Sequence, residues 1–223
     1  MVYITGDCHG EFQKFSTKKF PQQKEMSYQD TMIVLGDFGL WHDTSEERYW
    51  LDWLNDKPFT TVFVDGNHEN FDRLYSDEFR EYDFHGGRAQ EIRRHIYHLM
   101  RGYVFEFDGK SFWAFGGAQS HDMEFRVNHK SWWEQELPSQ EEMNLGLKVL
   151  KDHGNEVDFV ISHCCPQDVA TFMGYYDADR ITMYFSDVVS KIRYGSWWFG
   201  HYHREEDIFG KFHCRYEKIE RIV

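Results

Sequence analysis

Five short polar clusters recur along the chain, and each directly follows an apolar run that predicts a buried strand. The clusters occupy Gly6–Gly10, Gly36–Gly39, Gly66–Glu69, Ser162–His163 and Gly200–His203. Short apolar runs bounded by turn residues are typical of strands that are covered on both faces. A chain with this pattern has to fold so that several strand ends carry Asp, Asn and His side chains.

The first third of the chain alternates strands with helices. We predict strands at Val2–Thr5, Thr31–Leu35 and Phe59–Val64, with helices at Glu11–Phe20 and Ser45–Asn55 between them. This β-α-β-α-β order implies a parallel sheet with right-handed crossovers, and hence the α/β class.

The rest of the chain mixes strands, one long loop and two helices. A capping box at Ser139–Glu142 predicts a helix that stops near Gly154, and apolar residues at helical spacing predict a second helix over 179–194, ended by Gly195. Residues 118–138 read as an irregular loop, often a sign of function. Further strands are predicted at Ile92–Leu99, Tyr103–Phe107, Ser111–Phe115, Val157–Ile161, Ser196–Phe199, Asp207–Phe209 and Phe212–Tyr216, with an Asp108-Gly109 hairpin. No repeat or linker interrupts the chain, so we expect one domain over residues 1–223.

Charge and hydropathy exclude some classes of protein. The formal net charge is −13, whereas proteins that bind long nucleic acids usually present a basic face. No apolar stretch approaches the roughly 20 residues that a membrane-spanning helix needs. The sequence enters the strand-like Val2–Ile4 without a preceding signal peptide. We therefore expect a cytoplasmic protein with no membrane partner.

The cysteines do not form a metal-binding motif of their own. Cys8, Cys164, Cys165 and Cys214 make neither a CxxC pair nor a zinc-knuckle pattern. Free cysteines are commonly small buried residues, so we expect reduced thiols that fill the core. Direct metal ligation by Cys164 is the alternative.

The five clusters together predict a metal site. In α/β sheets, ligands bind beyond the carboxyl ends of the strands, where these clusters lie. The spacings Asp7-x-His9 and His201-x-His203 each put two side chains on one face of extended backbone. Alone, Asp7 would more often be a helix N-cap and a single His a core or surface residue. Nitrogen and oxygen donors in this mixture suit Mn²⁺, Fe²⁺/Fe³⁺ or Zn²⁺ better than Mg²⁺ or Ca²⁺.

The five clusters resemble the motifs of the calcineurin-like metallophosphoesterase superfamily, which are GDxHG, GDxx, GNHE/D, a lone His after a later strand, and GHxH. All five occur in this order over residues 6–203. The resemblance implies a four-layer αββα fold, a β-sandwich flanked by helices, with a dinuclear metal centre at the C-terminal ends of its strands.

The resemblance also implies a role for each motif residue. The first ion would be held by Asp7, His9, Asp37 and His203, and the second by Asp37, Asn67, His163 and His201. Asp37 would bridge two divalent transition-metal ions, with manganese expected first and iron or zinc as alternatives. His68 would not ligate; it would act beside the phosphate as a general acid or a hydrogen-bond donor.

The implied activity is metal-dependent hydrolysis of phosphate esters by a bridging hydroxide, which metal coordination makes available at neutral pH. The Ser/Thr protein phosphatases continue GDxxDRG after the bridging Asp, whereas this chain reads Asp37-Phe38-Gly39-Leu40-Trp41. The phosphate-binding arginine of that motif is absent, and the chain is closer to the small bacterial and phage-type branch. We expect a small-molecule phosphoester substrate, a diester before a monoester. Candidate substrate-binding residues in the 118–138 loop are Arg126, His121 and Trp132.

Two other functions fit the same motifs. A nuclease or nucleotide hydrolase would use the same metal chemistry but would need a basic or aromatic groove. An inactive, metal-bound interaction scaffold would be expected to have lost ligands, and none is missing here. Aromatic residues of the 118–138 loop would either cap the site or form the face of a homo-oligomer.

Overall fold

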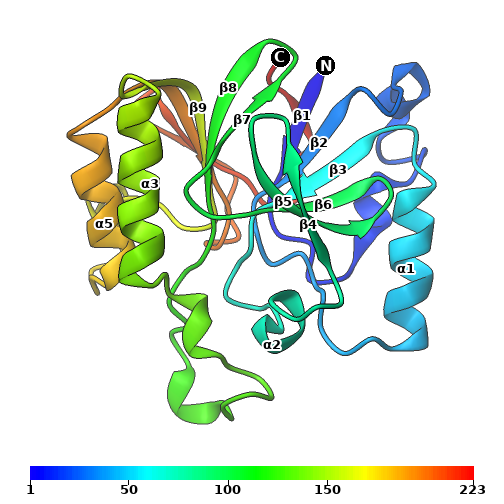
Figure 1. The fold of residues 1–223 in the computed structure, drawn as a ribbon, viewed down its shortest axis with the longest axis horizontal. Helices are drawn as coiled ribbons and strands as arrows, with labels where there is room; N and C mark the ends of the chain where they lie inside the picture. The colour runs from blue at the N-terminus through cyan, green and yellow to red at the C-terminus, as the bar shows by residue number, and fades with distance from the viewer.

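The structure, a computed structural model of residues 1–223, contains two mixed β-sheets packed face to face between layers of helices (Figure 1). The first sheet has seven strands, in the order β13 (Glu220–Arg221), β1 (Val2–Thr5), β2 (Thr31–Val34), β3 (Thr60–Phe63), β6 (Ile96–Leu99), β5 (Gly87–Arg93) and β4 (Arg80–Phe84). Strands β1, β2, β3 and β6 are parallel, as the β-α-β-α-β pattern predicted for the first three.

The second sheet has six strands. Their order is β11 (Glu206–Ile208), β12 (Phe212–Cys214), β10 (Arg193–Phe199), β9 (Glu156–Ser162), β8 (Lys110–Phe115) and β7 (Val104–Phe107). Strands β8, β9, β10 and β12 run parallel, while β7 and β8 form the hairpin predicted at Asp108-Gly109. Both sheets therefore send several strand ends to the same side of the molecule.

The side-chain alternation of the strands divides the buried residues into three layers. In β1, Val2 and Ile4 pack between the two sheets, whereas Tyr3 packs on the outer face of the first sheet. In β10, Trp198 packs between the sheets and Trp197 on the outer face of the second. Because successive side chains in a strand point to opposite faces, a near-continuous apolar run is needed to fill two layers at once.

Helices cover the two outer faces and complete the four layers (Figure 1). Helix α1 (Ser45–Asn55) buries Leu51 and Leu54 against the first sheet. Helices α3 (Gln140–Asp152), α4 (Gln167–Phe172) and α5 (Arg180–Val189) cover the second. The capping box at Ser139 and Glu142 is present, and the short α2 (Phe71–Leu74) follows the third polar cluster. The α/β four-layer fold is therefore confirmed.

The helix predicted at Glu11–Phe20 is wrong. The segment instead contains one 3₁₀ turn, Phe12–Phe15, and a second 3₁₀ turn, Pro21–Glu25, follows directly after it. Phe12, Lys14 and Phe15 are all buried, and these positions do not share one face of an α-helix. Burial of the lysine together with both phenylalanines therefore favours a tighter, irregular path.

Two other boundaries also differ from the predictions. The strand predicted at Ile92–Leu99 is two antiparallel strands, β5 and β6, because the polar Arg94-His95 pair forms a tight turn. Helix α5 ends at Val189, and Gly195 lies within β10. A Cβ atom at Gly195 would lie 2.6 Å from the carbonyl oxygen of Asp158, so the neighbouring strand explains this glycine.

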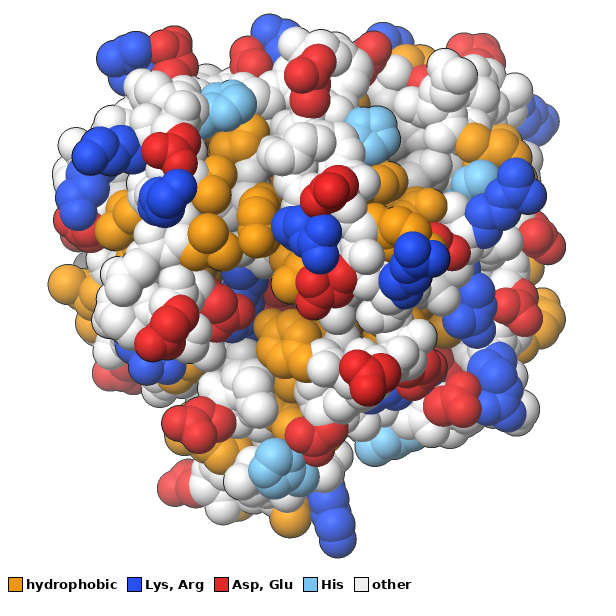
Figure 2. Space-filling view, in the orientation of Figure 1, with side chains coloured by type: hydrophobic (Ala, Val, Ile, Leu, Met, Phe, Trp, Pro, Cys, Tyr) orange, Lys and Arg blue, Asp and Glu red, His pale blue; other side chains and the backbone are white.

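The surface and the cysteines bear on the composition-based predictions. No helix is both long and apolar enough to cross a membrane. On the face shown in Figure 2, Lys and Arg side chains are interspersed with Asp and Glu and form no continuous basic band. All four cysteines are buried free thiols. The shared layer between the sheets favours one domain over residues 1–223, which stays a prediction.

Candidate metal centre

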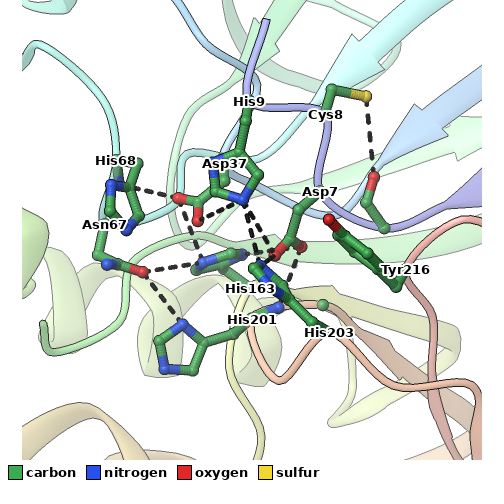
Figure 3. Close-up of polar contacts among 12 residues, drawn as sticks. Asp7, Cys8, His9, Asp37, Asn67, His68, His163, His201, His203 and Tyr216 are labelled. Carbon is green, nitrogen blue, oxygen red and sulfur yellow. Dashed lines mark hydrogen bonds and ion pairs between the residues drawn. The ribbon is translucent and has the colours of Figure 1, made fainter. Parts of the chain in front are cut away.

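The predicted metal ligands meet where strands of both sheets end (Figure 3). Asp7 and His9 follow β1, Asp37 follows β2, Asn67 follows β3, His163 follows β9, and His201 and His203 follow β10. The first sheet thus contributes both carboxylates, the amide and one imidazole, and the second contributes the other three of the four imidazoles. The two halves of the ligand set can meet only when the sheets pack together.

The first group of ligand atoms surrounds Asp7. Its Oδ2 atom lies 3.0 Å from Nε2 of His203 and 3.9 Å from Nε2 of His9. The two imidazole nitrogens lie 3.2 Å apart. Asp37 closes the group, with its Oδ2 atom 3.7 Å from Nε2 of His9.

The second group surrounds the amide oxygen of Asn67. Oδ1 of Asn67 lies 3.1 Å from Nε2 of His163 and 3.0 Å from Nδ1 of His201. Oδ1 of Asp37 lies 3.4 Å from the same His163 nitrogen. The two oxygens of Asp37 therefore face different groups, which is the arrangement that a bridging carboxylate needs.

These atoms fit transition-metal ions. Oδ2 of Asp7 is buried and has no aligned hydrogen bond, although His203 points toward it. Nδ1 of His163 lies 2.7 Å from the carbonyl oxygen of Leu35, and such a bond commonly orients a metal-binding imidazole. With no thiolate in either group, the donor set suits manganese, iron or zinc. Cys8 turns away, toward the carbonyl oxygen of Gly6 (Figure 3).

The backbone is strained where it presents these ligands. The φ angles of His9, Asp37, His201 and His203 are 48°, 43°, 65° and 50°, in the left-handed region that L-residues seldom adopt. Such strain typically costs about 1–3 kcal/mol per residue and tends to cluster at functional sites. Four of the seven predicted ligands share it, so local preference alone does not explain their conformation.

The glycine before Asn67 is required by a close approach to Asp37. A Cβ atom at Gly66 would lie 2.0 Å from Oδ1 and 2.3 Å from the backbone nitrogen of Asp37. This glycine therefore lets β2 and β3 bring their two ligands together.

Gly66→Ala is expected to lower the free energy of unfolding by about 1–3 kcal/mol, the usual cost of overpacking, and to weaken metal binding by displacing Asp37. Urea unfolding and metal titration would measure the two effects. Gly109→Ala is the matched control, since its Cβ would meet nothing within 4 Å. That control should show only backbone strain, with metal affinity unchanged; equal loss of metal affinity in both variants would contradict the steric explanation.

Asp37 and His163 form a buried ion pair. Burial by itself would raise the pKa of Asp37, but the charge of His163 outweighs it and lowers that pKa. Burial also opposes protonation of His163, yet the charge of Asp37 raises the pKa of His163 to about 10. Both ring nitrogens of His163 face oxygen atoms. The metal-free protein therefore holds this histidine as an imidazolium at neutral pH.

Metal binding at pH 7 is expected to release about one proton from His163, because a ligating nitrogen has to be deprotonated. Calorimetric heats in buffers of different ionisation enthalpy would measure the release, and heats that do not depend on the buffer would contradict it.

The raised pKa of His163 is also expected to stabilise the metal-free fold. That contribution is complete below pH 6.5, the ordinary pKa of a histidine, and is lost as the pH rises to about 10. Urea unfolding in EDTA at a series of pH values would follow the loss.

His68 lies beside the two groups and faces Arg126. Its backbone N–H donates to Oδ1 of Asp37 over 2.8 Å, and its ring centroid is 5.3 Å from that of His9. Two guanidinium nitrogens of Arg126 lie 3.4 and 3.2 Å from the two ring nitrogens of His68. Burial lowers the pKa of His68; the charge of Asp37 opposes this, and that of Arg126 adds to it. The imidazole is therefore neutral at pH 7.

The loop candidates for substrate binding lie in different places. Arg126 reaches the site and is held by Asp122 and by the carbonyl oxygen of Ser131, at 2.7 and 3.2 Å. The exposed His121 ring lies 5.6 Å from that of His201, at the edge of the second group. Trp132 is half-buried, with an indole nitrogen that has no hydrogen-bond partner. Substrate binding by these three residues stays a prediction.

Sequence reasoning missed two residues that support the ligands. Lys14 is buried and donates to the carbonyl oxygens of Asp7 and Tyr216, at 2.7 and 2.8 Å, so it ties the first ligand turn to the C-terminal segment. Glu69 accepts the backbone N–H of Phe38 at 2.7 Å and shapes the turn at Asp37. Burial, aided by Asp37, raises the pKa of Glu69 to about 8. Glu69 ends the third motif and could have been found there, whereas nothing local marks Lys14.

Comparison with known proteins assigns the chain to a family. A family model for calcineurin-like phosphoesterases matches residues 1–205, which include every motif described above. A comparison with curated proteins finds no match. The resemblance drawn from the five motifs is confirmed, while the bacterial and phage-type branch stays a prediction. The chain belongs to the calcineurin-like phosphoesterase family.

Proposed function

We propose that this protein hydrolyses phosphodiesters of small molecules and uses two divalent ions held by the seven residues of the metal centre. Family membership supports metal-dependent phosphoester hydrolysis in general. The observation that carries the proposal further is the placement of Asp37, whose two oxygens face separate groups of ligand atoms. A carboxylate in that position can hold two ions at once.

The two groups would bind one ion each. Asp7, His9, Asp37 and His203 would hold the first, and Asp37, Asn67, His163 and His201 the second. Bound there, divalent ions would lower the pKa of a coordinated water and stabilise charge on the phosphoryl oxygens. Manganese is the expected ion, with iron or zinc as alternatives, because the donors are imidazole, carboxylate and amide.

The chain's own residues supply the rest of the chemistry. His68, with its lowered pKa, would present a ring N–H beside the leaving oxygen. Arg126, whose side chain is 12 % exposed, would keep that ring neutral and add positive charge where an anionic substrate binds. It would serve in place of the arginine that follows the bridging Asp in the protein phosphatases. His121 would line the opposite edge of the site.

A small substrate fits the surface better than a long nucleic acid. The net charge of −13 and the mixed charges on the face in Figure 2 give little attraction for a polyanion. These charges therefore argue against a nuclease, which is the alternative function. The four buried free cysteines support a reducing compartment such as the cytoplasm.

A panel of esters with the Mn²⁺-loaded protein tests the proposal. We expect hydrolysis of bis(p-nitrophenyl) phosphate with higher kcat/KM than p-nitrophenyl phosphate, loss of activity in EDTA, and little cleavage of oligonucleotides. Preference for the monoester would overturn the diester assignment, and oligonucleotide cleavage would support the nuclease. Two bound ions without activity on any ester would support the inactive scaffold instead.

A further inference from the structure

We propose that Glu136 and Ser120, in the irregular 118–138 loop, are positioning residues that fix which end of the Asn67 amide faces the second ion. This inference rests on the proposed role of Asn67 as a metal ligand. An asparagine side chain can present either its oxygen or its NH₂ group in the same direction, and only the oxygen binds a metal ion. Something in the surroundings therefore has to select the orientation.

A short hydrogen-bond chain leads from Glu136 to Asn67. The backbone N–H of Ser120 donates to Oε1 of Glu136 at 2.8 Å, and the Ser120 hydroxyl donates to Oε2 at 2.7 Å. Nδ2 of Asn67 in turn donates to Oγ of Ser120 at 3.1 Å. All three residues are buried, with exposed fractions of 0 %, 3 % and 4 % for Glu136, Ser120 and Asn67. Water therefore does not compete for these bonds.

The direction of each bond follows from the carboxylate. Burial raises the pKa of the Glu136 carboxyl, and the two hydrogen bonds that it accepts from Ser120 oppose that rise. The ionised carboxylate only accepts hydrogen bonds, so in that form the single hydroxyl proton of Ser120 points toward Glu136. The lone pairs of Ser120 Oγ then require a donor, and only the NH₂ group of Asn67 can supply one. Oδ1 of Asn67 is left facing His163 and His201. The ionised carboxylate of Glu136 thus selects the metal-binding orientation of the Asn67 amide, to which it is connected through two hydrogen bonds.

The segment that carries Glu136 is itself anchored beside Asn67. The buried Arg101 donates to the carbonyl oxygen of Gln135 at 2.8 Å and to the Asp65 carboxylate through Nε at 3.0 Å. Asp65 lies two residues before Asn67. The Arg101 guanidinium therefore binds one residue near each end of the hydrogen-bond chain, Gln135 beside Glu136 and Asp65 near Asn67. The geometry of the chain thus does not depend on the exposed part of the loop.

The near-isosteric variant Glu136→Gln gives the sharpest test. The oxygen of the introduced amide can accept from the Ser120 N–H only if the NH₂ group of that amide faces Ser120 Oγ. The NH₂ group then donates to Oγ, and the hydroxyl proton of Ser120 turns toward Asn67. The Asn67 amide should then flip and present NH₂ to the second ion. We expect Glu136→Gln and Ser120→Ala to weaken one Mn²⁺ site by about 10–100-fold, measured by calorimetry, with the other site unchanged.

Asn67→Asp provides a control that distinguishes orientation of the Asn67 amide from a general structural role of Glu136. A carboxylate can accept from the Ser120 hydroxyl and still offer an oxygen to the ion. Glu136→Gln should therefore cost nothing in Mn²⁺ affinity in the Asn67→Asp background. An equal loss in both backgrounds, or an equal weakening of both sites, would overturn the proposal.

A measurement without metal separates this inference from the proposed function. In the metal-free wild-type protein, one Asn67 side-chain NH₂ proton should exchange slowly with solvent because it is buried and bonded to Ser120. Its resonance is assigned by its loss in Asn67→Asp. Rapid exchange would overturn the positioning role even if the protein binds two ions. Slow exchange in a protein that binds no ion would support the hydrogen-bond chain and contradict the metal centre.

Discussion

Asp37→Asn is expected to remove at least one of the two ions and to lower kcat on a phosphodiester by about 10²-fold or more. The reason lies in the geometry: Oδ2 of Asp37 faces His9 and Oδ1 faces His163, at 3.7 and 3.4 Å. An amide keeps only one oxygen and turns an NH₂ group toward one of these histidines. It also removes one of the two negative charges that would balance the ions.

Metal content per chain and kcat at saturating Mn²⁺ measure this loss. Asp77→Asn is the matched control, because Asp77 is exposed and lies outside the metal centre. It should retain two ions and full activity. Retention of both ions by Asp37→Asn, with kcat within about tenfold of wild type, would show that Asp37 does not bridge.

His68→Ala should lower kcat by about 10²-fold or more while metal content stays at two ions, because His68 touches the site without being placed as a ligand. The lowered pKa of its ring, caused first by burial, means that the neutral form is present at pH 7. A neutral ring can still donate one N–H to a phosphoryl or leaving oxygen. We therefore expect His68→Gln, which keeps an N–H donor, to lose less activity than His68→Ala.

A series of diesters with leaving groups of increasing pKa separates the two roles of His68. If the ring transfers a proton to the leaving oxygen, the deficit of His68→Ala grows along the series. If the ring donates a hydrogen bond to a phosphoryl oxygen, the deficit is uniform. His42→Ala is the control, since His42 is exposed and should leave kcat unchanged. A deficit as small as that of the control would remove His68 from the mechanism.

Elements with strong local signals were predicted well. Helix α1 has the predicted bounds Ser45–Asn55, and α3 begins at the predicted capping box of Ser139. Strands β1 to β3 were placed within one or two residues because each has to fill two buried layers. Segments whose burial depends on residues far away in the sequence were predicted poorly, and Glu11–Phe20 is the clearest case. The buried Lys14 of this segment donates a hydrogen bond to the carbonyl oxygen of Tyr216, which lies 202 positions further along the chain.

The ligand candidates could be identified in the sequence for a similar local reason. Each sits in a short turn directly after a strand, and a glycine such as Gly66 lets the turn pass close to a neighbouring ligand. Strand, turn and ligand are therefore adjacent in sequence and can be read together. That the seven residues converge was an inference from the parallel sheet, and the distances around Asp37 agree with it.

The sequence by itself determined the family, the four-layer α/β fold and the set of ligand candidates, because these follow from the periodicity of strands and from short motifs. Only the tertiary structure decided what surrounds them. Arg126 lies on His68, 58 positions away, and Glu136 orients Asn67 through Ser120. These contacts depend on the path of an irregular loop, and no local repeat or periodicity encodes that path. The five polar clusters thus predict where metal ions would bind, while the path of the loop between β8 and α3 determines which side chains lie beside those ligands.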